Sequence, residues 1–177
     1  MQEAKDTVFS LQIFEAFFER LFYLDDKIGE FEQGAGWRQV MLHAGQDDRW
    51  RAGAAEPYPL PEGSSLAGAD HRFAPGQRIE RHDSDLEWLA GWLPAWRRGA
   101  QLTIDYGAPF PALYHRRPRG TLRAYFAQQR YVELAEILAR PGRQDLTCDV
   151  DFTDLAGRGQ LLGLGAEPLW GQADFIS

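Results

Sequence analysis

The chain has 177 residues, which suits one domain, and its apolar fraction of 44% is ordinary for a globular protein. Its formal net charge of −7 argues against a nucleic-acid backbone or an anionic lipid surface as the main partner, because both attract basic proteins. Cys148 is the one cysteine, so no disulfide can form within the chain, and a reducing compartment is the simplest setting.

The sequence carries no sign of export or of membrane insertion. Its first ten residues include Glu3 and Asp6 and lack both the basic start and the apolar run of a secretory signal. No apolar stretch approaches the roughly 20 residues that span a bilayer. We therefore expect a cytoplasmic protein.

The first two regions along the chain are residues 1–43 and 44–77. In the first, apolar residues over Val8–Leu24 recur at spacings of three and four, which predicts an amphipathic helix. Phe31–Leu42 predicts a hairpin that turns at Gln33–Gly36. Residues 44–77 are rich in Gly, Ala, Pro and Ser and predict an irregular connection, either a functional lid or a mobile insert.

The third region, residues 78–177, has the clearest alternation of helix and strand patterns. Ser84–Glu87 has the S-x-x-E form of a capping box, and Pro94 should end the helix that it opens. The segments that predict further elements are, in order, a buried strand at Gln101–Tyr106, strands at Thr121–Phe126 and Asp145–Phe152, a helix at Thr153–Leu162 and a last strand at Glu167–Phe175. This order predicts the α/β class, with a mixed sheet that has an antiparallel edge.

Several segments of this region match the motifs of one family in the family's order. They are Leu102–Gly107 (LTIDYG), Tyr114-His115, Arg119–Tyr125 (RGTLRAY), Pro141–Thr147 (PGRQDLT), Val150–Thr153 (VDFT) and Gly171–Phe175 (GQADF). Together they resemble the MidA-type methyltransferases. That family includes a mitochondrial complex I assembly factor that methylates an arginine.

The resemblance implies a fold and a chemistry. The fold is the Rossmann-like class I methyltransferase sheet, of which this chain would form a part as a single domain over residues 1–177. The Leu102 strand would be the fifth strand, and antiparallel strands would close the sheet at its C-terminal end. The methyl donor would be S-adenosylmethionine, and a protein arginine would be the acceptor.

The sequence departs from the family where the cofactor binds. Members carry a glycine-rich E-x-G-x-G turn after the first strand, because the cofactor lies against bare backbone there. This chain has no such turn. Its nearest glycine pairs, Gly34 with Gly36 and Gly157 with Gly159, are interpreted as ordinary turns.

A second departure concerns the family's S-N-E-L-x-D-A motif after the fourth strand. Ser10–Ala16 is the matching segment, with Leu11 and Gln12 in place of the Asn and Glu. Ser10 and Gln12 are therefore the cofactor-side candidates, and the loss of the carboxylate argues against cofactor binding by this chain. We expect a fragment or a degenerate relative, with an open sheet edge through which it self-associates.

The polar side chains of the third region are candidates for the acceptor side of the site. They are Asp105, Tyr106, Tyr114, His115, Arg119, Arg123, Asp149 and Asp151. Structural alternatives stay open for most of them. Asp105 could cap the turn at Gly107, and His115 could be an exposed loop histidine. The basic run that includes Arg119 and Arg123 could contact an acidic partner or carboxylates of its own fold, and a solvated surface is the interpretation we favour. Asp149 and Asp151 could grip an arginine, or Asp151 could cap the following helix.

Two further patterns are given structural interpretations. His71, His82, Asp83 and Asp85 fit no compact metal-ligand spacing, so no metal is expected. Trp88, Trp92 and Trp96 recur every four residues, which is typical of a packing stripe on a helix. The leading hypothesis is thus a methyltransferase part, and the alternative is a non-catalytic interaction module derived from that fold.

Overall fold

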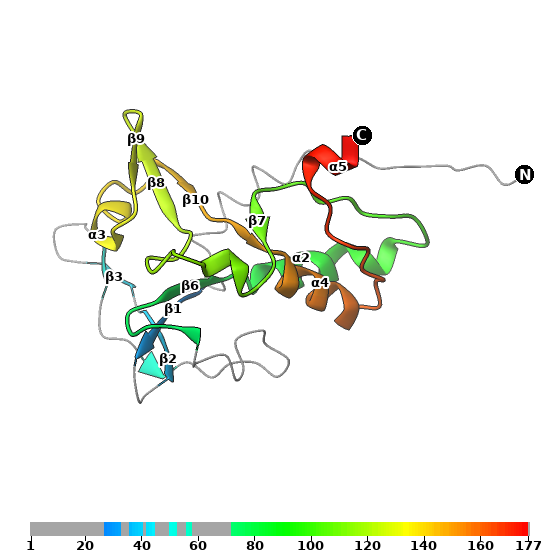
Figure 1. Ribbon diagram of the computed structural model, residues 1–177, viewed down its shortest axis with the longest axis horizontal. Coiled ribbons are helices and arrows are strands. Elements are labelled where there is room, and N and C mark those ends of the chain that lie inside the picture. Colours follow the sequence, from blue (N-terminus) through cyan, green and yellow to red (C-terminus); the bar gives the residue numbers. More distant parts are fainter. Residues whose placement is uncertain are drawn as a thin grey trace, which may run out of the picture.

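The computed structural model describes residues 27–32, 36–40, 42–44, 50–52, 56–57 and 72–176. The predicted helix Val8–Leu24, with Ser10 and Gln12, lies outside the described residues, as does His71. Figure 1 shows small sheets linked end to end, with a helical layer beside them. Parallel and antiparallel strand pairs both occur, so the predicted mixed α/β class is confirmed.

The first sheet is antiparallel and has the strand order β5-β2-β1-β6. Its strands are β1 (Lys27–Glu32), β2 (Gly36–Gln39), β5 (Glu56–Pro57) and β6 (Arg78–Arg81). The β1–β2 pair, with Glu32 opposite Gly36, confirms the predicted hairpin, although β1 begins earlier than expected. Strands β3 (Leu42–Ala44) and β4 (Trp50–Ala52) form a separate antiparallel pair.

Within the described part of residues 44–77, where an irregular connection was predicted, β4 and β5 are strands, whereas residues 72–77 contain no strand. Pro57 is compatible with β5 because this strand is at the edge of its sheet, where a missing amide hydrogen costs little. Short strands of this kind give no sustained alternation, so the sequence pattern did not reveal them.

Two helices pack against each other beside the sheets, α2 (Ser84–Trp92) and α4 (Phe152–Leu161) (Figure 1). Helix α2 gives way to a single 3-10 turn over Leu93–Ala95, as Pro94 predicts. The capping-box prediction is wrong by one residue: the cap position is Asp83, and its side chain makes no capping hydrogen bond. The Asp83 carboxylate instead contacts Arg81 and, at 3.3 Å, Nη2 of Arg158 on α4.

The parallel pair joins β7 (Gly107–Ala108) to β11 (Val150–Asp151), with Gly107 opposite Val150. The predicted buried strand Gln101–Tyr106 is wrong. These residues have no regular secondary structure, and Leu102, Ile104 and Tyr106 are 42%, 65% and 77% exposed. The reason is that β11 is short and lies beside β7, so within the described residues nothing reaches the backbone before Tyr106.

A three-stranded antiparallel sheet has the order β10-β8-β9 (Figure 1). Its strands are β8 (Arg123–Phe126), β9 (Gln129–Tyr131) and β10 (Asp145–Thr147), and the short helix α3 (Leu134–Ile137) follows β9. Strand β8 confirms the prediction at Thr121–Phe126. The predicted strand Asp145–Phe152 is in fact two strands, because the chain leaves this sheet at Cys148 and joins β7 through β11.

At the C-terminal end, α4 confirms the predicted helix near Thr153–Leu162. The strand predicted over Glu167–Phe175 is wrong: residues 164–171 are irregular, and α5 (Gln172–Ile176) follows. Leu169, Trp170 and Phe175 are all exposed there. An apolar segment becomes a strand only beside a partner strand, and within the described residues this one has none.

Among the described residues, the buried side chains form two clusters. One lies between β8, α3 and β10 and includes Leu122, Ala124, Ile137 and Leu146. The other is Trp37, Ile79, Leu113 and Tyr114, against which Phe73 and Phe110 pack. The rings of the predicted tryptophan stripe contact one another along α2 and the turn that follows it, with ring centroids 5.3 Å apart for Trp88–Trp92 and 4.8 Å for Trp92–Trp96. No helix within the described ranges is long and apolar enough to cross a membrane.

Candidate functional site

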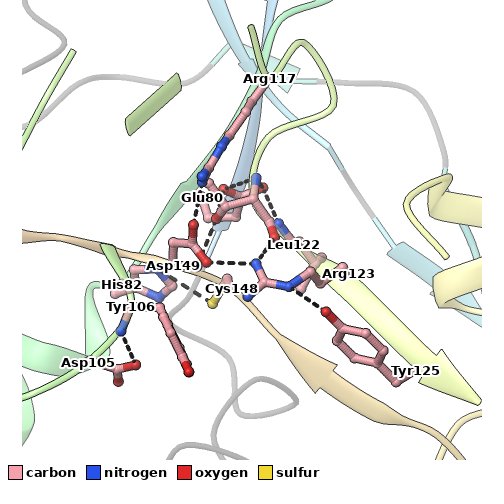
Figure 2. Close-up of polar contacts among 11 residues, drawn as sticks. Glu80, His82, Asp105, Tyr106, Arg117, Leu122, Arg123, Tyr125, Cys148 and Asp149 are labelled. Atoms are coloured by element: carbon pink, nitrogen blue, oxygen red, sulfur yellow. Dashed lines mark hydrogen bonds and ion pairs between the residues drawn. The ribbon is translucent and has the colours of Figure 1, made fainter. Parts of the chain in front are cut away.

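The candidate site is built on a buried carboxylate, Glu80, at the junction of β6 with the segment 117–123. Strand β6 places Glu80 inside, where it is 8% exposed. Its carboxylate accepts hydrogen bonds from the amide of Thr121 at 2.9 Å, the Thr121 hydroxyl at 2.8 Å and the amide of Leu122 at 3.1 Å (Figure 2). Gly120 precedes them with φ +74°, and a Cβ there would collide with the Glu80 carboxylate.

Asp149 is the second buried carboxylate, and it is held by two arginines. Nη1 of Arg123 donates to it at 2.7 Å, and Nη1 of Arg117 donates to its other oxygen (Figure 2). Burial would raise the pKa of Asp149, but the hydrogen bonds from Arg123 and Arg117 outweigh it and lower the pKa. The Thr121 hydroxyl accepts from the Asp149 amide at 3.0 Å, which links this carboxylate to the Glu80 junction.

Arginines of the basic run at residues 116–123 form hydrogen bonds and ion pairs with carboxylates of the same chain. Besides its pair with Asp149, Arg123 donates to the Tyr125 hydroxyl at 3.2 Å, and Nε of Arg119 donates to Glu133 at 2.9 Å. Burial would lower the pKa of Arg123, but its bonds to Asp149 and Tyr125 raise it, so the guanidinium stays protonated. Arg117, Arg119 and Arg123 thus contact carboxylates of their own fold, while Arg116, Arg117 and Arg119 are also exposed, as a solvated surface would have it.

Asp105 and Tyr106 stand at the exposed side of this cluster, just before β7. The Asp105 carboxylate accepts from the Tyr106 amide at 2.7 Å, and it forms no ion pair with any described residue. Partial burial raises the pKa of Asp105, and the negative charge of Asp149 raises it further. The local hydrogen bond fits the predicted turn-capping role, and it leaves an oxygen of the carboxylate accessible.

Asp151 takes the capping role that the sequence left open. Its Oδ1 accepts from the amides of Thr153 at 2.9 Å and Asp154 at 3.3 Å, at the start of α4. Burial, with the nearby charge of Asp154, raises the pKa of Asp151 to about 6. Asp149 and Asp151 therefore do not act as a pair on one face, since each is committed to a different structural contact.

The remaining candidates are Tyr114, His115 and Arg119, and the structure places each of them differently. Tyr114 is buried in the core, its hydroxyl lies 3.2 Å from both the amide and the carbonyl of Glu80, and burial raises its pKa well above 10. His115 is exposed on the loop that follows, which agrees with its structural alternative. Arg119 is exposed and points toward Glu133.

Sequence reasoning missed the central role of Glu80 and the contact between two buried groups, His82 and Cys148. Nε2 of His82 lies 3.7 Å from Sγ of Cys148, beside Asp149 (Figure 2). The sequence shows Glu80 as a charged residue next to the apolar Ile79 in a short strand. Such a residue is usually exposed on the opposite face of the strand, so the pattern gives no sign that Glu80 is buried. The described residues hold no group of three or more His, Cys, Asp or Glu side chains placed to bind a metal ion.

The described residues do not fit a cradle for S-adenosylmethionine. Such a cradle needs free backbone amides at a glycine turn between a strand and a helix. In the described chain β6 leads into α2, β9 into α3 and β11 into α4, and none of these junctions carries a glycine. At the start of α4, Asp151 already accepts from the amides. Gly157 and Gly159 lie inside α4, and Gly36 is the first residue of β2 in the hairpin.

The sequence matches a known family along most of its length. Residues 9–168 match the family described as "Putative S-adenosyl-L-methionine-dependent methyltransferase". The chain belongs to this family. No protein of curated function matches the chain in sequence.

Two solved structures from Burkholderia thailandensis share the fold of this family member. One is a COG1565 superfamily member bound to S-adenosyl-homocysteine, with TM-score 0.62 and 25% identity, covering 79% of this chain and 35% of that chain. The other is the native crystal structure of an uncharacterized COG1565 superfamily protein, with TM-score 0.58 and 24% identity, covering 78% and 36%. The chain thus spans about a third of the length of these relatives.

Proposed function

We propose that this chain forms the acceptor side of a MidA-type methyltransferase that transfers a methyl group from S-adenosylmethionine to an arginine of a protein. The family match supports methyl transfer, and the relative bound to S-adenosyl-homocysteine supports the cofactor. The MidA type rests on the ordered motifs between Leu102 and Phe175.

The observation that carries the arginine acceptor is the exposed pair Asp105 and Tyr106. A guanidinium binds well to a carboxylate and to the face of an aromatic ring. Asp149 already has two arginine partners, whereas Asp105 has no ion-pair partner within the described residues. Asp105 is therefore the carboxylate of this cluster that is available to an external cation.

Electrostatics supports the same assignment. Burial raises the pKa of Asp105 and repulsion by the Asp149 carboxylate raises it further, while the Tyr106 amide and the charges of Arg123 and His82 lower it by less. An incoming guanidinium would offset that repulsion and favour the ionised form of Asp105. The described residues would then bind and orient the acceptor nitrogen, and methyl transfer depends strongly on such positioning. The cofactor would be held by residues other than those described.

The test is a titration of an amidated Gly-Arg-Gly peptide into the full chain, in which NMR chemical shifts of the protein report binding. We expect shifts centred on Asp105 and Tyr106, and a roughly tenfold loss of affinity in Asp105→Asn, since one charge-assisted contact is removed. A Gly-Lys-Gly peptide controls for charge alone, and Asp145→Asn controls for loss of an exposed carboxylate elsewhere. Equal affinity in the wild type and Asp105→Asn, or no binding at all, would contradict the proposal.

The second candidate is a non-catalytic interaction module. It is favoured by the strand-to-helix junctions of the described residues, none of which carries a glycine turn with free amides for a cofactor. Calorimetric titration of S-adenosyl-homocysteine into the full chain tests the module directly, because micromolar affinity would argue against it. If the folded chain does not bind the cofactor product, the arginine-peptide titration separates the candidates: binding at Asp105 supports the acceptor side, and no binding supports the module.

A further inference from the structure

The guanidinium of Arg123 is held on two sides, and one of its nitrogens is unused. Nε donates to the Tyr125 hydroxyl at 3.2 Å, and Nη1 donates to the Thr121 carbonyl at 3.0 Å and to Asp149 at 2.7 Å. Among the described residues, nothing accepts a hydrogen bond from Nη2. This nitrogen is open to solvent, and the side chain as a whole is 19% exposed. Because every guanidinium nitrogen carries N–H donors, those of Nη2 remain available to a ligand.

These unused donors lie near Asp105, the carboxylate that we assign to the acceptor arginine. Burial has the largest effect on the pKa of Asp105 and raises it, and the charge of Arg123 is one of the effects that lower it. Within the described residues the two side chains form no ion pair, and Figure 2 shows Asp149 between them. A carboxylate and a guanidinium thus stand near each other without contact. A ligand that carries both charges is complementary to such a pair.

Arg117, the other partner of Asp149, is less suited to bind a ligand in this way. It has one hydrogen bond to a described residue, the one to Asp149, and its side chain is 46% exposed. It therefore keeps more rotamer freedom, and the loss of that freedom on binding costs free energy. Of the two arginines, Arg123 also has the larger effect on the pKa of Asp105. Arg123 is thus the cation that is both fixed and near the acceptor carboxylate.

We propose that Arg123 binds a carboxylate of the substrate, so that the acceptor arginine is followed or preceded by an aspartate or a glutamate. The inference rests on the proposed function, because it places the acceptor arginine at Asp105. The Nη2 donors form charge-assisted hydrogen bonds with the substrate carboxylate. Arg123 loses little freedom in doing so, since Tyr125, Thr121 and Asp149 already hold its other two nitrogens.

The local charge balance favours an acidic neighbour over a neutral one. Asp105 and Asp149 are the carboxylates of the cluster. Arg117 and Arg123 balance their charges, so these side chains are neutral together before the acceptor arrives. A bound acceptor arginine adds a positive charge, and a carboxylate beside it restores neutrality. No Asp or Glu lies between Asp105 and Glu133 in the sequence, a stretch that contains Arg116, Arg117, Arg119, Arg123 and Arg130.

The first experiment titrates acetylated and amidated tetrapeptides into the full chain at about 0.15 M salt, where long-range attraction is screened. Gly-Arg-Glu-Gly is compared with Gly-Arg-Gln-Gly, and Gly-Glu-Arg-Gly with Gly-Gln-Arg-Gly. We expect one acidic peptide to bind roughly tenfold more tightly than its neutral match and to cause the larger NMR shift of the Arg123 Nε–H resonance. Equal affinities within both pairs overturn this inference and leave the proposed function standing. No binding of any peptide overturns both.

The second experiment repeats the comparison with two variants that keep a cation beside Asp149. Arg123→Lys removes the Nη2 donors, so the preference for the acidic peptide should fall to about twofold or less. Arg117→Lys makes the same change on the other partner of Asp149 and should leave the preference intact. Circular dichroism checks that both variants fold.

Three results of the variant comparison contradict the role of Arg123. An unchanged preference in Arg123→Lys shows that another group binds the carboxylate. An equal loss of preference in both variants assigns the effect to the charge of the exposed basic run. A loss of affinity in Arg123→Lys that is the same for acidic and neutral peptides shows that Arg123 binds a backbone carbonyl of the substrate.

Discussion

Replacement of Glu80 by alanine tests the junction that holds the site together. The change removes the acceptor of two buried amides, those of Thr121 and Leu122, and of the Thr121 hydroxyl. Each buried donor left without a partner costs about 1–3 kcal/mol, and water entering the space recovers part of that. We therefore expect the free energy of unfolding to fall by about 3–5 kcal/mol.

A graded series makes the Glu80 prediction measurable even where alanine prevents folding. Glu80→Gln keeps one oxygen for the two amides and should cost about 1–2 kcal/mol. Glu87→Ala, at an exposed position of α2, should change stability by less than about 0.5 kcal/mol. The assay is urea unfolding with hydrogen exchange at Thr121 and Leu122. A cost below about 1 kcal/mol for Glu80→Ala, with unchanged exchange, would refute the role assigned to this carboxylate.

Three other changes have defined outcomes. Burial raises the pKa of Asp151 to about 6, so the stability that its protonated form contributes is lost as the pH rises through 6. Asp151→Asn keeps a side chain that can cap α4 and carries no charge. This variant should therefore be more stable than the wild type above pH 6, by up to about 3 kcal/mol. Gly120→Ala combines a positive φ with a collision and should cost about 2–4 kcal/mol, against about 1 kcal/mol for Gly142→Ala, where φ is +71° and the space is open. Ala127 and Gln128 form the β8–β9 turn with φ values of +49° and +63°, so Ala127→Asn with Gln128→Gly should raise stability by about 1 kcal/mol.

Each of these outcomes can fail in a recognisable way. A constant stability difference between wild type and Asp151→Asn from pH 4 to 8 would show that this carboxyl does not titrate near 6. Equal costs for the two glycine variants would mean that the close approach to Glu80 is relieved without penalty. Loss of stability in the turn double variant would show that the two positive φ values are absent in solution. Thermal or urea unfolding measures all three.

Local sequence patterns predicted the elements that are stabilised by contacts between residues close together in the sequence. The hairpin at Phe31–Leu42 and helix α4 were both predicted, because a glycine turn and a carboxylate cap act over only a few residues. The capping box at Ser84 failed by one residue, since the Asp83 side chain binds arginines of other elements. The strand pattern at Gln101–Tyr106 failed because a strand also needs a neighbour, which the pattern cannot supply.

The sequence by itself determined the α/β class, the main turns and helix starts, and the set of polar residues from which the site is drawn. Tertiary structure alone decided how those residues are used. In the folded chain Glu80 is buried and binds Thr121, and Tyr114 lies in the core. Asp149 is paired with two arginines, whereas Asp105 remains accessible. The hydrogen bonds responsible join residues that lie 26 to 42 positions apart in the sequence. The periodicity of a local segment carries no information about contacts at such separations.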